Sequence, residues 1–267
     1  MLSLHTNAAA LSTQNALGST QKALSTSMTR LGTGYRVNSA MDDAAGLQIA
    51  TRLNAQTRGM AVAQRNTQNG ISMMQTAEGA FAEVTDILLR MKDLATESAN
   101  GTASTEDKAA LKAEFDALGL EMGNILDNTT FGGAKLLNGG TLAASIDFQI
   151  GATTAEVMTV DVSAALGAVT APTAIGAAAD IDTIATAINN VGTLRSQLGA
   201  ASNRLDHVYN NLANMRTNTD AAKGRIMDVD YASETANMTS KQMLMQASSS
   251  MLKQSSSMSQ LVMSLMQ

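Results

Sequence analysis

The chain has 267 residues, of which 45% are hydrophobic but only 3% aromatic, and it contains neither tryptophan nor cysteine. The lack of cysteine excludes a disulfide framework and a cysteine-ligated zinc site. The formal net charge of −5 argues against nucleic-acid binding, which usually requires a basic face. No apolar run approaches the length of a membrane span, and the first residues lack the pattern of a cleaved signal peptide, so we expect no membrane insertion.

The first 41 residues contain no acidic side chain and are rich in Ser, Thr, Asn and Ala. Apolar residues spaced by seven predict a helix with a thin apolar stripe, at Leu17, Leu24 and Leu31. A helix with so little apolar surface is not stable alone, and a partner must supply further apolar surface to cover its stripe.

A turn is expected to follow this first helix. Gly32 and Gly34 are suited to ending it, because glycine adopts the left-handed backbone that closes many helices. Asn38-Ser39 is expected to cap the next helix, with Asp42 and Asp43 in its first turn, where carboxylates interact favourably with the helix dipole.

The stretch from 71 to 98 has the clearest helical pattern in the chain. Its apolar residues recur at alternating steps of three and four, at Met74, Ala77, Phe81, Val84, Leu88, Met91 and Ala95. This spacing is the seam of an α-helix and does not fit a strand. So narrow a stripe is stable only when partner helices cover it.

Two later segments repeat the same steps and are expected to provide that cover. One contains Leu111, Phe115, Leu118, Met122 and Ile125; the other contains Leu194, Leu198, Ala201, Leu205, Val208, Leu212 and Met215. The simplest assembly is an antiparallel bundle in which the second helix folds back through Gly101 and the third returns beside both. Ser104 and Asp107 have the spacing of a capping box at the start of the second helix.

Between the second and third bundle helices, alternating apolar residues predict a β-hairpin over about 145–162. The turn-rich sequence FGGAKLLNGG precedes it, and Asn138-Gly139 is the strongest short hairpin signal there. The Ala, Gly and Thr-rich run 163–180 around Pro172 is expected to be a connector too short for another domain. The predicted fold class is therefore mainly α, an elongated antiparallel helical bundle or coiled coil with a small β-hairpin.

The end of the chain has the same character as its beginning. No acidic residue follows Glu234, and apolar residues recur by sevens among Ser and Gln, at Leu244, Met251, Met258 and Leu265. We expect these two charge-poor ends to pair with each other and with copies of the chain. The predicted domains are a terminal one, 1–42 with 224–267, disordered in the free monomer, and a bundle, 43–180 with 181–223.

Several stretches of the chain resemble bacterial flagellin, the subunit of the flagellar filament. They are GYRVNSAMDDAAGLQIATRL (34–53), RNTQNGISMMQTAEGAFAEV (65–84), LRMKDLATESANG (89–101), TTFGGAKLL (129–137) and GRIMDVDYASETANMTSKQMLMQA (224–247). The tail departs from the family's usual Ala-rich pattern with a proline, because it has Ser in place of Ala, no proline and many methionines.

The resemblance implies a structural subunit that self-assembles into the filament, the helical propeller for swimming, and that is secreted by type III export to the extracellular flagellum. It implies no enzyme activity and no cofactor. The paired ends would form the inner core, with the polymerisation contacts at the two sets of heptad residues, Leu17, Leu24, Leu31, Leu244, Met251, Met258 and Leu265. Further partners implied are a flagellar export chaperone, the cap and hook-junction proteins. The variable outer domain of many flagellins is reduced here to the vestigial connector 163–180.

Three residues match positions where many flagellins contact the Toll-like receptor that senses them in animals, namely Arg90, Leu94 and Glu114. The seam leaves Arg90 off the core, whereas Leu94 borders it. The alternative is that Arg90 is only a solvated helix residue and Leu94 only a flank of the seam.

Other functions remain as alternatives to the filament subunit. A flagellar hook-filament junction protein is the nearest, because it shares flagellin-like ends; a secreted helical translocator is more distant. Asp228, Asp230 and Glu234 resemble an acidic metal-ligand cluster, but the glycine of a calcium loop is absent, so we interpret them as capping and packing residues.

Overall fold

A computed structural model describes residues 7–265 of the chain, with side chains described as far as residue 257. The chain divides into two compact units, an end unit made of 1–55 and 218–267 and a central unit made of 56–217. Within the described residues there are six α-helices and four short strands, and all four strands lie between α3 and α4, so the prediction of a mainly helical fold with a small hairpin is confirmed. None of the described helices is both long and apolar enough to cross a membrane.

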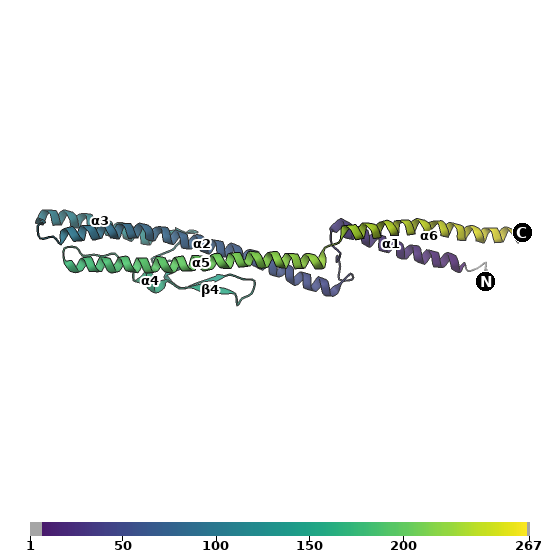
Figure 1. Cartoon of the computed structure of the whole chain (residues 1–267), viewed down its shortest axis with the longest axis horizontal. Coiled ribbons are helices and arrows are strands. Elements are labelled where there is room, and N and C mark those ends of the chain that lie inside the picture. The colour runs from purple at the N-terminus through teal and green to yellow at the C-terminus, as the bar shows by residue number, and fades with distance from the viewer. Residues whose placement is uncertain (1–6, 266–267) are drawn as a thin grey trace. The chain divides into compact units, whose positions relative to one another are not determined.

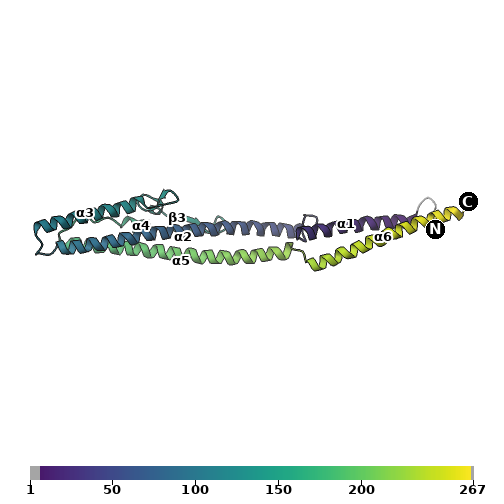
Figure 2. The ribbon, with the colours of Figure 1, turned by 90° about the horizontal axis from the view of Figure 1, so that it is seen from above.

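Three helices build the core of the central unit: α2 (Ala44–Ser98), α3 (Thr105–Asn128) and α5 (Ala178–Met227). Both ribbon views show α5 alongside α2 and α3 folded back on α2 (Figures 1 and 2). Contacts between α2 and α5 run antiparallel, since Arg195 lies 3.8 Å from Glu78 and Arg216 donates to Gln64 over 3.3 Å. The antiparallel bundle is therefore present as predicted.

The apolar seam of α2 is the centre of this core. All seven of its predicted residues have no exposed surface: Met74, Ala77, Phe81, Val84, Leu88, Met91 and Ala95. From α3 the buried residues are Phe115 and Met122, while Leu111, Leu118 and Ile125 pack half-buried against the cluster. On α5 the prediction fails at its last residue, because Met215 is 37% exposed beyond the end of the apolar stripe.

The capping box at the start of α3 is confirmed. The Ser104 hydroxyl accepts from the Asp107 N–H over 3.1 Å, and the Asp107 carboxylate accepts from the Ser104 N–H over 3.2 Å. Hydrogen bonds to the Asp107 carboxyl from the Ser104 side chain and from the Ser104 backbone N–H hold the pKa of Asp107 below its usual value. They satisfy donors that the first helical turn would otherwise leave unpaired.

The predicted β-hairpin consists of β3 (Ile146–Gln149) and β4 (Val157–Val160), antiparallel with Ile146 opposite Val160. Its apolar face turns Met158 and Val160 into the core, which leaves them 4% and 6% exposed. At its turn, a side chain on Gly59 of α2 would collide with Ala152, at only 2.6 Å. The hairpin thus lies directly on the α2 backbone.

A second, smaller hairpin precedes it and corrects one expectation. The strands are β1 (Thr130–Phe131) and β2 (Ala134–Lys135), and their turn is Gly132-Gly133, not Asn138-Gly139. Both of these glycines have positive φ, 59° and 86°, which a two-residue turn of this hand requires. Asn138 instead leads into the 3-10 turn η1 (Thr141–Ala143) and donates to the Asp127 carboxylate over 2.6 Å.

The connector 163–180 is more ordered than expected. It begins with the short helix α4 (Ser163–Gly167), and Leu166, Val169 and Pro172 are buried against the bundle. This Ala and Gly-rich run contains few large apolar residues, but those few pack in or against the hydrophobic core of the central unit. In the last part, 173–177, the residues are exposed except Ile175, which packs half-buried against the core.

The end unit contains α1 (Ala8–Thr33) and α6 (Tyr231–Leu265), which lie side by side in both ribbon views (Figures 1 and 2). Gly34 closes α1 in the left-handed conformation, with φ 75°, as expected, whereas Gly32 lies inside the helix. The following residues pair with the segment before α6: Arg36 N–H donates to the Met227 carbonyl over 2.6 Å, and Val229 N–H to the Gly34 carbonyl over 3.0 Å.

The start of α2 also differs in detail from the prediction. The helix begins at Ala44, and the capping side chain is Asp43, which accepts from the Gly46 N–H over 2.8 Å. Asn38 and Ser39 lie in the preceding loop. Asp42 is not in the first helical turn but closes that loop on itself.

Candidate functional site

Among the described surfaces, that of the α1–α6 helix pair points most clearly to a function. The two helices pack antiparallel, and polar contacts near both ends of α1 mark their register. At the open end of the pair, the Asn7 side-chain amide donates to the Ser255 carbonyl over 3.1 Å and to its hydroxyl over 3.2 Å. Toward the other end, the partners are Ser27 with Lys241 and Arg30 with Glu234.

Ser27 occupies a position where the apolar stripe of α1 would carry a hydrophobic residue, between Leu24 and Leu31. Its side chain has no exposed surface, and its hydroxyl accepts from Lys241 Nζ over 2.9 Å. A buried hydroxyl without a partner is destabilising, so this bond favours the one register that supplies it. The long Lys241 stem also covers apolar surface on the way to its ammonium group.

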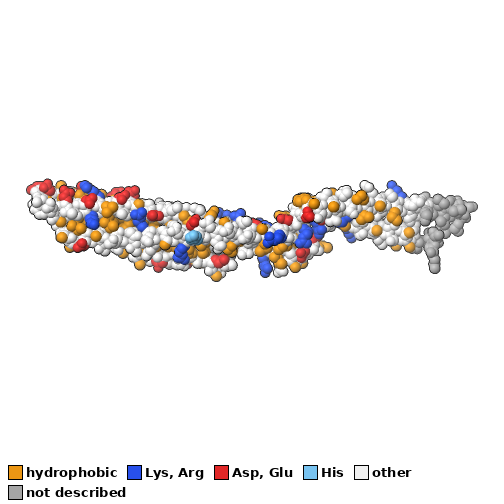
Figure 3. Space-filling model, in the orientation of Figure 1, with side chains coloured by type: hydrophobic (Ala, Val, Ile, Leu, Met, Phe, Trp, Pro, Cys, Tyr) orange, Lys and Arg blue, Asp and Glu red, His pale blue; other side chains and the backbone are white. Residues whose placement is uncertain are grey.

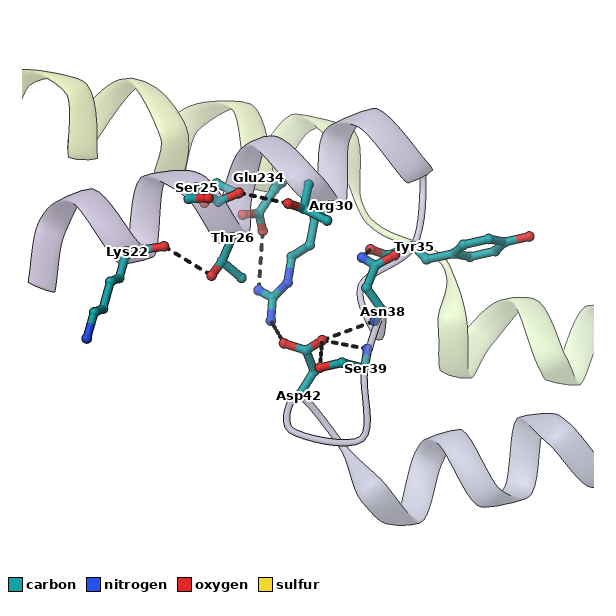
Figure 4. A network of polar contacts seen from close by, with 12 residues as sticks. Lys22, Ser25, Thr26, Arg30, Tyr35, Asn38, Ser39, Asp42 and Glu234 are labelled. Carbon is teal, nitrogen blue, oxygen red and sulfur yellow. Dashed lines mark hydrogen bonds and ion pairs between the residues drawn. The ribbon is translucent and has the colours of Figure 1, made fainter.

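Arg30 lies between two carboxylates, 3.8 Å from Asp42 and 3.8 Å from Glu234 (Figure 4). Glu234 is only 7% exposed, and its second oxygen has no hydrogen-bond partner among the described residues. The guanidinium therefore provides the main compensation for a buried charge on α6.

Asp42 is held by its own loop as well as by Arg30. Its carboxylate accepts from the N–H groups of Ser39 and Asn38 over 2.9 and 3.1 Å, and from the Ser39 hydroxyl over 3.1 Å (Figure 4). These bonds, first those from the Ser39 and Asn38 backbone, hold the pKa of Asp42 below its ordinary value. The ionised carboxylate thus ties the α1–α2 loop to the α1–α6 pair through Arg30.

The three acidic residues near the start of α6 do not converge. Glu234 faces Arg30, whereas Asp230 accepts from the Ser233 hydroxyl over 2.6 Å and from the Ala232 N–H over 3.1 Å. These bonds lower the pKa of Asp230 and cap the helix. Asp228 bridges to Tyr35 through the backbone. Capping and pairing, as interpreted from the sequence, describe their contacts.

The two sets of heptad residues lie in different surroundings. On α1, Leu24 is 8% exposed and Leu17 and Leu31 are half-buried, on the stripe that also carries Ser27. On α6, Leu244 and Met251 are 54% and 65% exposed, because the stripe that faces α1 runs instead through Glu234 and Lys241. The side chains of Met258 and Leu265 lie outside the described residues.

Further large apolar side chains on this pair are exposed. They are Leu11, Met28, Tyr231 and Met243, between 53% and 60% exposed. Figure 3 shows apolar side chains spread over the visible face of the α1–α6 pair. Exposed apolar surface of this extent marks a site for association with another protein.

The three residues matched to receptor contacts divide into an exposed pair and a buried residue. Arg90 of α2 donates from Nε and Nη2 to one Glu114 oxygen of α3, over 2.9 and 2.7 Å, and both side chains are about half exposed. The Glu114 carboxylate raises the pKa of Arg90. Leu94 has no exposed surface, which corrects the expectation that it borders the seam. It belongs to the core, so only Arg90 and Glu114 are available at the surface.

Sequence reasoning missed Ser27, Lys241 and the Arg30 contacts as determinants of the α1–α6 pair. The signal available was the spacing of Ser27, three residues after Leu24 and four before Leu31. A polar residue at such a position requires a partner on the facing helix. Which residue supplies it depends on the register, and the sequence does not give the register.

Two family models match the chain. The bacterial flagellin N-terminal helical region matches residues 4–141, and the bacterial flagellin C-terminal helical region matches 181–266. The segment between them contains β3, β4, α4 and the connector.

Individual relatives agree with these matches. A flagellin from Halalkalibacterium halodurans is 39% identical, with 98% of this chain and 99% of the relative covered. Flagellin A from Vibrio anguillarum is 34% identical over the full length of both. A solved structure of a putative flagellar hook-associated protein from Vibrio parahaemolyticus has a TM-score of 0.56 at 16% identity, covering 70% of this chain and all of that one, which is a likeness of fold. On the two family models and the full-length relatives, this chain belongs to the bacterial flagellin family.

Proposed function

We propose that this chain is the structural subunit that polymerises into the bacterial flagellar filament. The observation that carries the proposal is the α1–α6 pair, which exposes Leu244 and Met251 together with other large apolar side chains. Apolar surface of this kind is stable when other copies of the chain cover it. The product of such association is a homopolymer, and its role is mechanical, not enzymatic.

The charge of the pair supports an inner location in the polymer. Three of its five charged side chains, Arg30, Glu234 and Lys241, make contacts within the pair, and the other two, Lys22 and Lys253, are exposed. A surface poor in unpaired charge can be enclosed by neighbouring copies without a large desolvation penalty. We place the polymerisation contacts at Leu17, Leu24 and Leu31 of α1 and at Leu244, Met251, Met258 and Leu265 of α6.

This assignment is tested by charging the exposed stripe of α6. Met251→Asp places a carboxylate where neighbouring copies would exclude water, so seeded assembly is expected to fail. The matched control is Met251→Leu, which keeps the volume and apolar character and should assemble. The variant's central unit should melt as wild type does. Normal filaments from Met251→Asp would remove this residue from the polymer core.

The hook-filament junction protein is the alternative, and the likeness to a hook-associated protein extends to the fold alone. A filament subunit elongates seeds continuously, whereas a junction protein adds a limited layer. Electron microscopy of the purified chain with filament seeds separates them: long filaments support the proposal, and short caps support the alternative.

A second role follows from the exposed Arg90–Glu114 pair. We propose that these two side chains contact an animal Toll-like receptor, because they present a charged, half-exposed feature on the α2–α3 surface. Arg90→Ala with Glu114→Ala should weaken receptor activation by the free chain, since a central charged contact often contributes more than about 2 kcal/mol to an interface. Stability should hardly change, because exposed ion pairs add little to folding.

The control uses an ion pair on the same helix pair. Lys112→Ala with Asp116→Ala removes an exposed i,i+4 pair from α3 and should leave activation unchanged. If wild-type chain that is folded and polymerises does not activate receptor-bearing cells, Arg90 and Glu114 are only helix surface.

A further inference from the structure

Asparagine is followed directly by glycine at three places in this chain, Asn69-Gly70, Asn100-Gly101 and Asn138-Gly139. In such a pair the backbone nitrogen of the glycine can attack the asparagine side-chain amide carbon, because glycine has no Cβ to obstruct the approach. The asparagine is then converted to aspartate or isoaspartate. All three pairs lie in the central unit, and the fold determines which of them has a free glycine nitrogen and a side chain able to reach it.

Two of the three glycines are required by the fold. Gly70 lies in α2, where a Cβ would come within 2.9 Å of the Phe148 ring. Gly139 has a φ of 63°, the left-handed backbone that glycine adopts without strain. Gly101 meets neither condition: its φ is not positive, and a Cβ on it would have no described atom beyond its chain neighbours within 4 Å. Neither packing nor backbone geometry therefore explains the glycine at 101.

Asn69 is protected by the helix that contains it. Asn69 and Gly70 lie in the middle of α2, where each backbone N–H is bonded to a carbonyl one turn earlier. The Gly70 nitrogen becomes available only when the helix opens locally. Such an opening is rare at the centre of a packed helix, so this pair is expected to react slowly.

Asn138 is exposed but held by two hydrogen bonds. Its backbone N–H donates to the Leu126 carbonyl over 3.1 Å, and its side-chain amide donates to the Asp127 carboxylate over 2.6 Å. The rotation that brings the amide carbon to the Gly139 nitrogen must break at least the second of these bonds. Asn138 is therefore restrained by its contacts with α3.

The contacts of Asn100 favour the reaction. Asn100 and Gly101 are exposed in the turn between α2 and α3, and the Gly101 N–H donates to no acceptor among the described residues. The Asn100 Oδ1 accepts from the Thr102 N–H over 3.3 Å, which folds the side chain over its own backbone. When the amide carbon is attacked, negative charge develops on this oxygen, and the same N–H stabilises it.

We propose that Asn100 is a site of spontaneous deamidation in the folded chain, with water as the co-reactant. The Gly101 nitrogen loses its proton and bonds to Cγ of Asn100, the Cγ–Nδ2 bond breaks, and Nδ2 leaves as ammonia, which forms a succinimide ring. Water then opens the ring, at Cγ to give aspartate or at the backbone carbonyl carbon to give isoaspartate. One water is consumed and one ammonia is released, with no change of oxidation state.

The modification changes the surface of the bundle and leaves its core alone. Each conversion adds a negative charge at the exposed turn, and the isoaspartyl product also adds a methylene group to the main chain. The capping box of Ser104 and Asp107 that begins α3 does not involve Asn100, so the bundle keeps its fold. The modified fraction increases with the time since folding and becomes a chemical record of the age of each copy.

The experiment incubates the folded, full-length chain in mildly alkaline buffer and measures deamidation by peptide mass spectrometry. The three asparagines lie in separate tryptic peptides, which begin after Arg65, Lys92 and Lys135. Asn100 should react about tenfold or more faster than the other two, which corresponds to about 1.4 kcal/mol or more of protection for them. Methyl transfer by a protein isoaspartyl methyltransferase identifies the isoaspartyl product. In urea the three rates should converge, because each asparagine then has only its glycine neighbour.

The matched variant is Gly101→Ala, which fits the ordinary φ and the open space at this position. Its Cβ obstructs the attack, so most of the deamidation at Asn100 should be lost while the circular dichroism and the melting temperature stay unchanged. Gly79→Ala is the control, since it makes the same change at another glycine with open space but does not follow an asparagine. It should leave the rate at Asn100 unaltered.

Three results would overturn the proposal. They are equal rates at the three asparagines in the folded chain, deamidation of Asn100 only in urea, and a wild-type rate at Asn100 in Gly101→Ala. The first two use wild-type chain alone and so do not depend on how the variant folds. None of these measurements requires filaments or a receptor, so this inference and the proposed functions succeed or fail separately.

Discussion

Lys241 of α6 donates a 2.9 Å hydrogen bond to the wholly buried hydroxyl of Ser27 on α1, across 214 positions of sequence. The bond exists in only one alignment of the two helices. A shift by one helical turn would leave the hydroxyl buried without a partner, so a single polar pair favours one register of an otherwise uniform, small-residue contact.

Lys241→Met is therefore expected to weaken the α1–α6 pair by about 1–2 kcal/mol, because the buried Ser27 hydroxyl loses its partner. Hydrogen exchange of α1 amides in assembled filaments measures the loss. Adding Ser27→Ala should recover most of it, since removing both polar partners leaves nothing unsatisfied. Lys253→Met, at an exposed position on the same helix, is the control and should change little.

The free chain is predicted to be disordered at both ends, because the α1–α6 pair buries little apolar surface to offset the entropy of ordering it. Brief trypsin treatment should cut at Lys22, Arg30, Lys241 and Lys253 before the central unit, and filaments should resist. Arg30 and Lys241 are partly covered within the pair, whereas Lys22 and Lys253 are exposed. If trypsin cuts the free chain quickly at Lys22 and Lys253 but slowly at Arg30 and Lys241, the pair persists in the free chain.

Phe81 of α2 is fully buried at the centre of the bundle. Phe81→Ala should destabilise the central unit by about 3–5 kcal/mol, through lost burial and the cavity left behind. Urea unfolding followed by circular dichroism measures the change. Leu89→Ala, eight residues along the same helix and 47% exposed, should have an effect below about 1 kcal/mol. Equal losses in the two variants would contradict the assigned core.

Ionisation of Asp42 makes the stability of the α1–α2 loop depend on pH. Hydrogen bonds from Ser39 and Asn38 lower its pKa in the folded chain below the ordinary 3.8. The ionised form is therefore stabilising above pH 3.8, and this contribution is lost as the pH falls through the lowered folded value.

Protection of the Ser39 amide in assembled filaments, measured against pH, tests this. Asp42→Asn should reduce the protection at pH 7, and its difference from wild type should shrink on acidification. Asp206→Asn, an exposed change on α5, is the control. A difference that stays constant down to pH 2 would show that the ionised carboxylate is not what holds the loop.

Where the periodicity was strong, sequence and structure agree closely. The seven seam residues from Met74 to Ala95 are all buried, since alternating steps of three and four admit only one helical face. The β3–β4 hairpin follows equally from its alternation.

Sequence and structure differ where the spacing of apolar residues does not determine which face of a helix is buried. Leu244 and Met251 recur by sevens but do not face α1, because α6 places Glu234 and Lys241 there and polar partners determine its rotation. Leu94 lies next to the seam residue Ala95 and is buried in the same hydrophobic cluster. Asp43 caps α2 in place of Asn38-Ser39 because the loop that Asp42 closes delays the start of the helix. Each of these outcomes depends on contacts between segments distant in sequence.

The buried Pro172 and the exposed Thr173 and Ala174 after it have a consequence for how this family varies in length. The alignment with Flagellin A of Vibrio anguillarum spans 379 positions, against 267 residues here. In this chain the connector is anchored by Leu166, Val169 and Pro172 on one side and by the start of α5 on the other. A foreign peptide inserted between Thr173 and Ala174 would start and end at residues whose positions are fixed, and it would not disturb the core, so this loop is a natural position for displaying an epitope or an affinity tag on every copy.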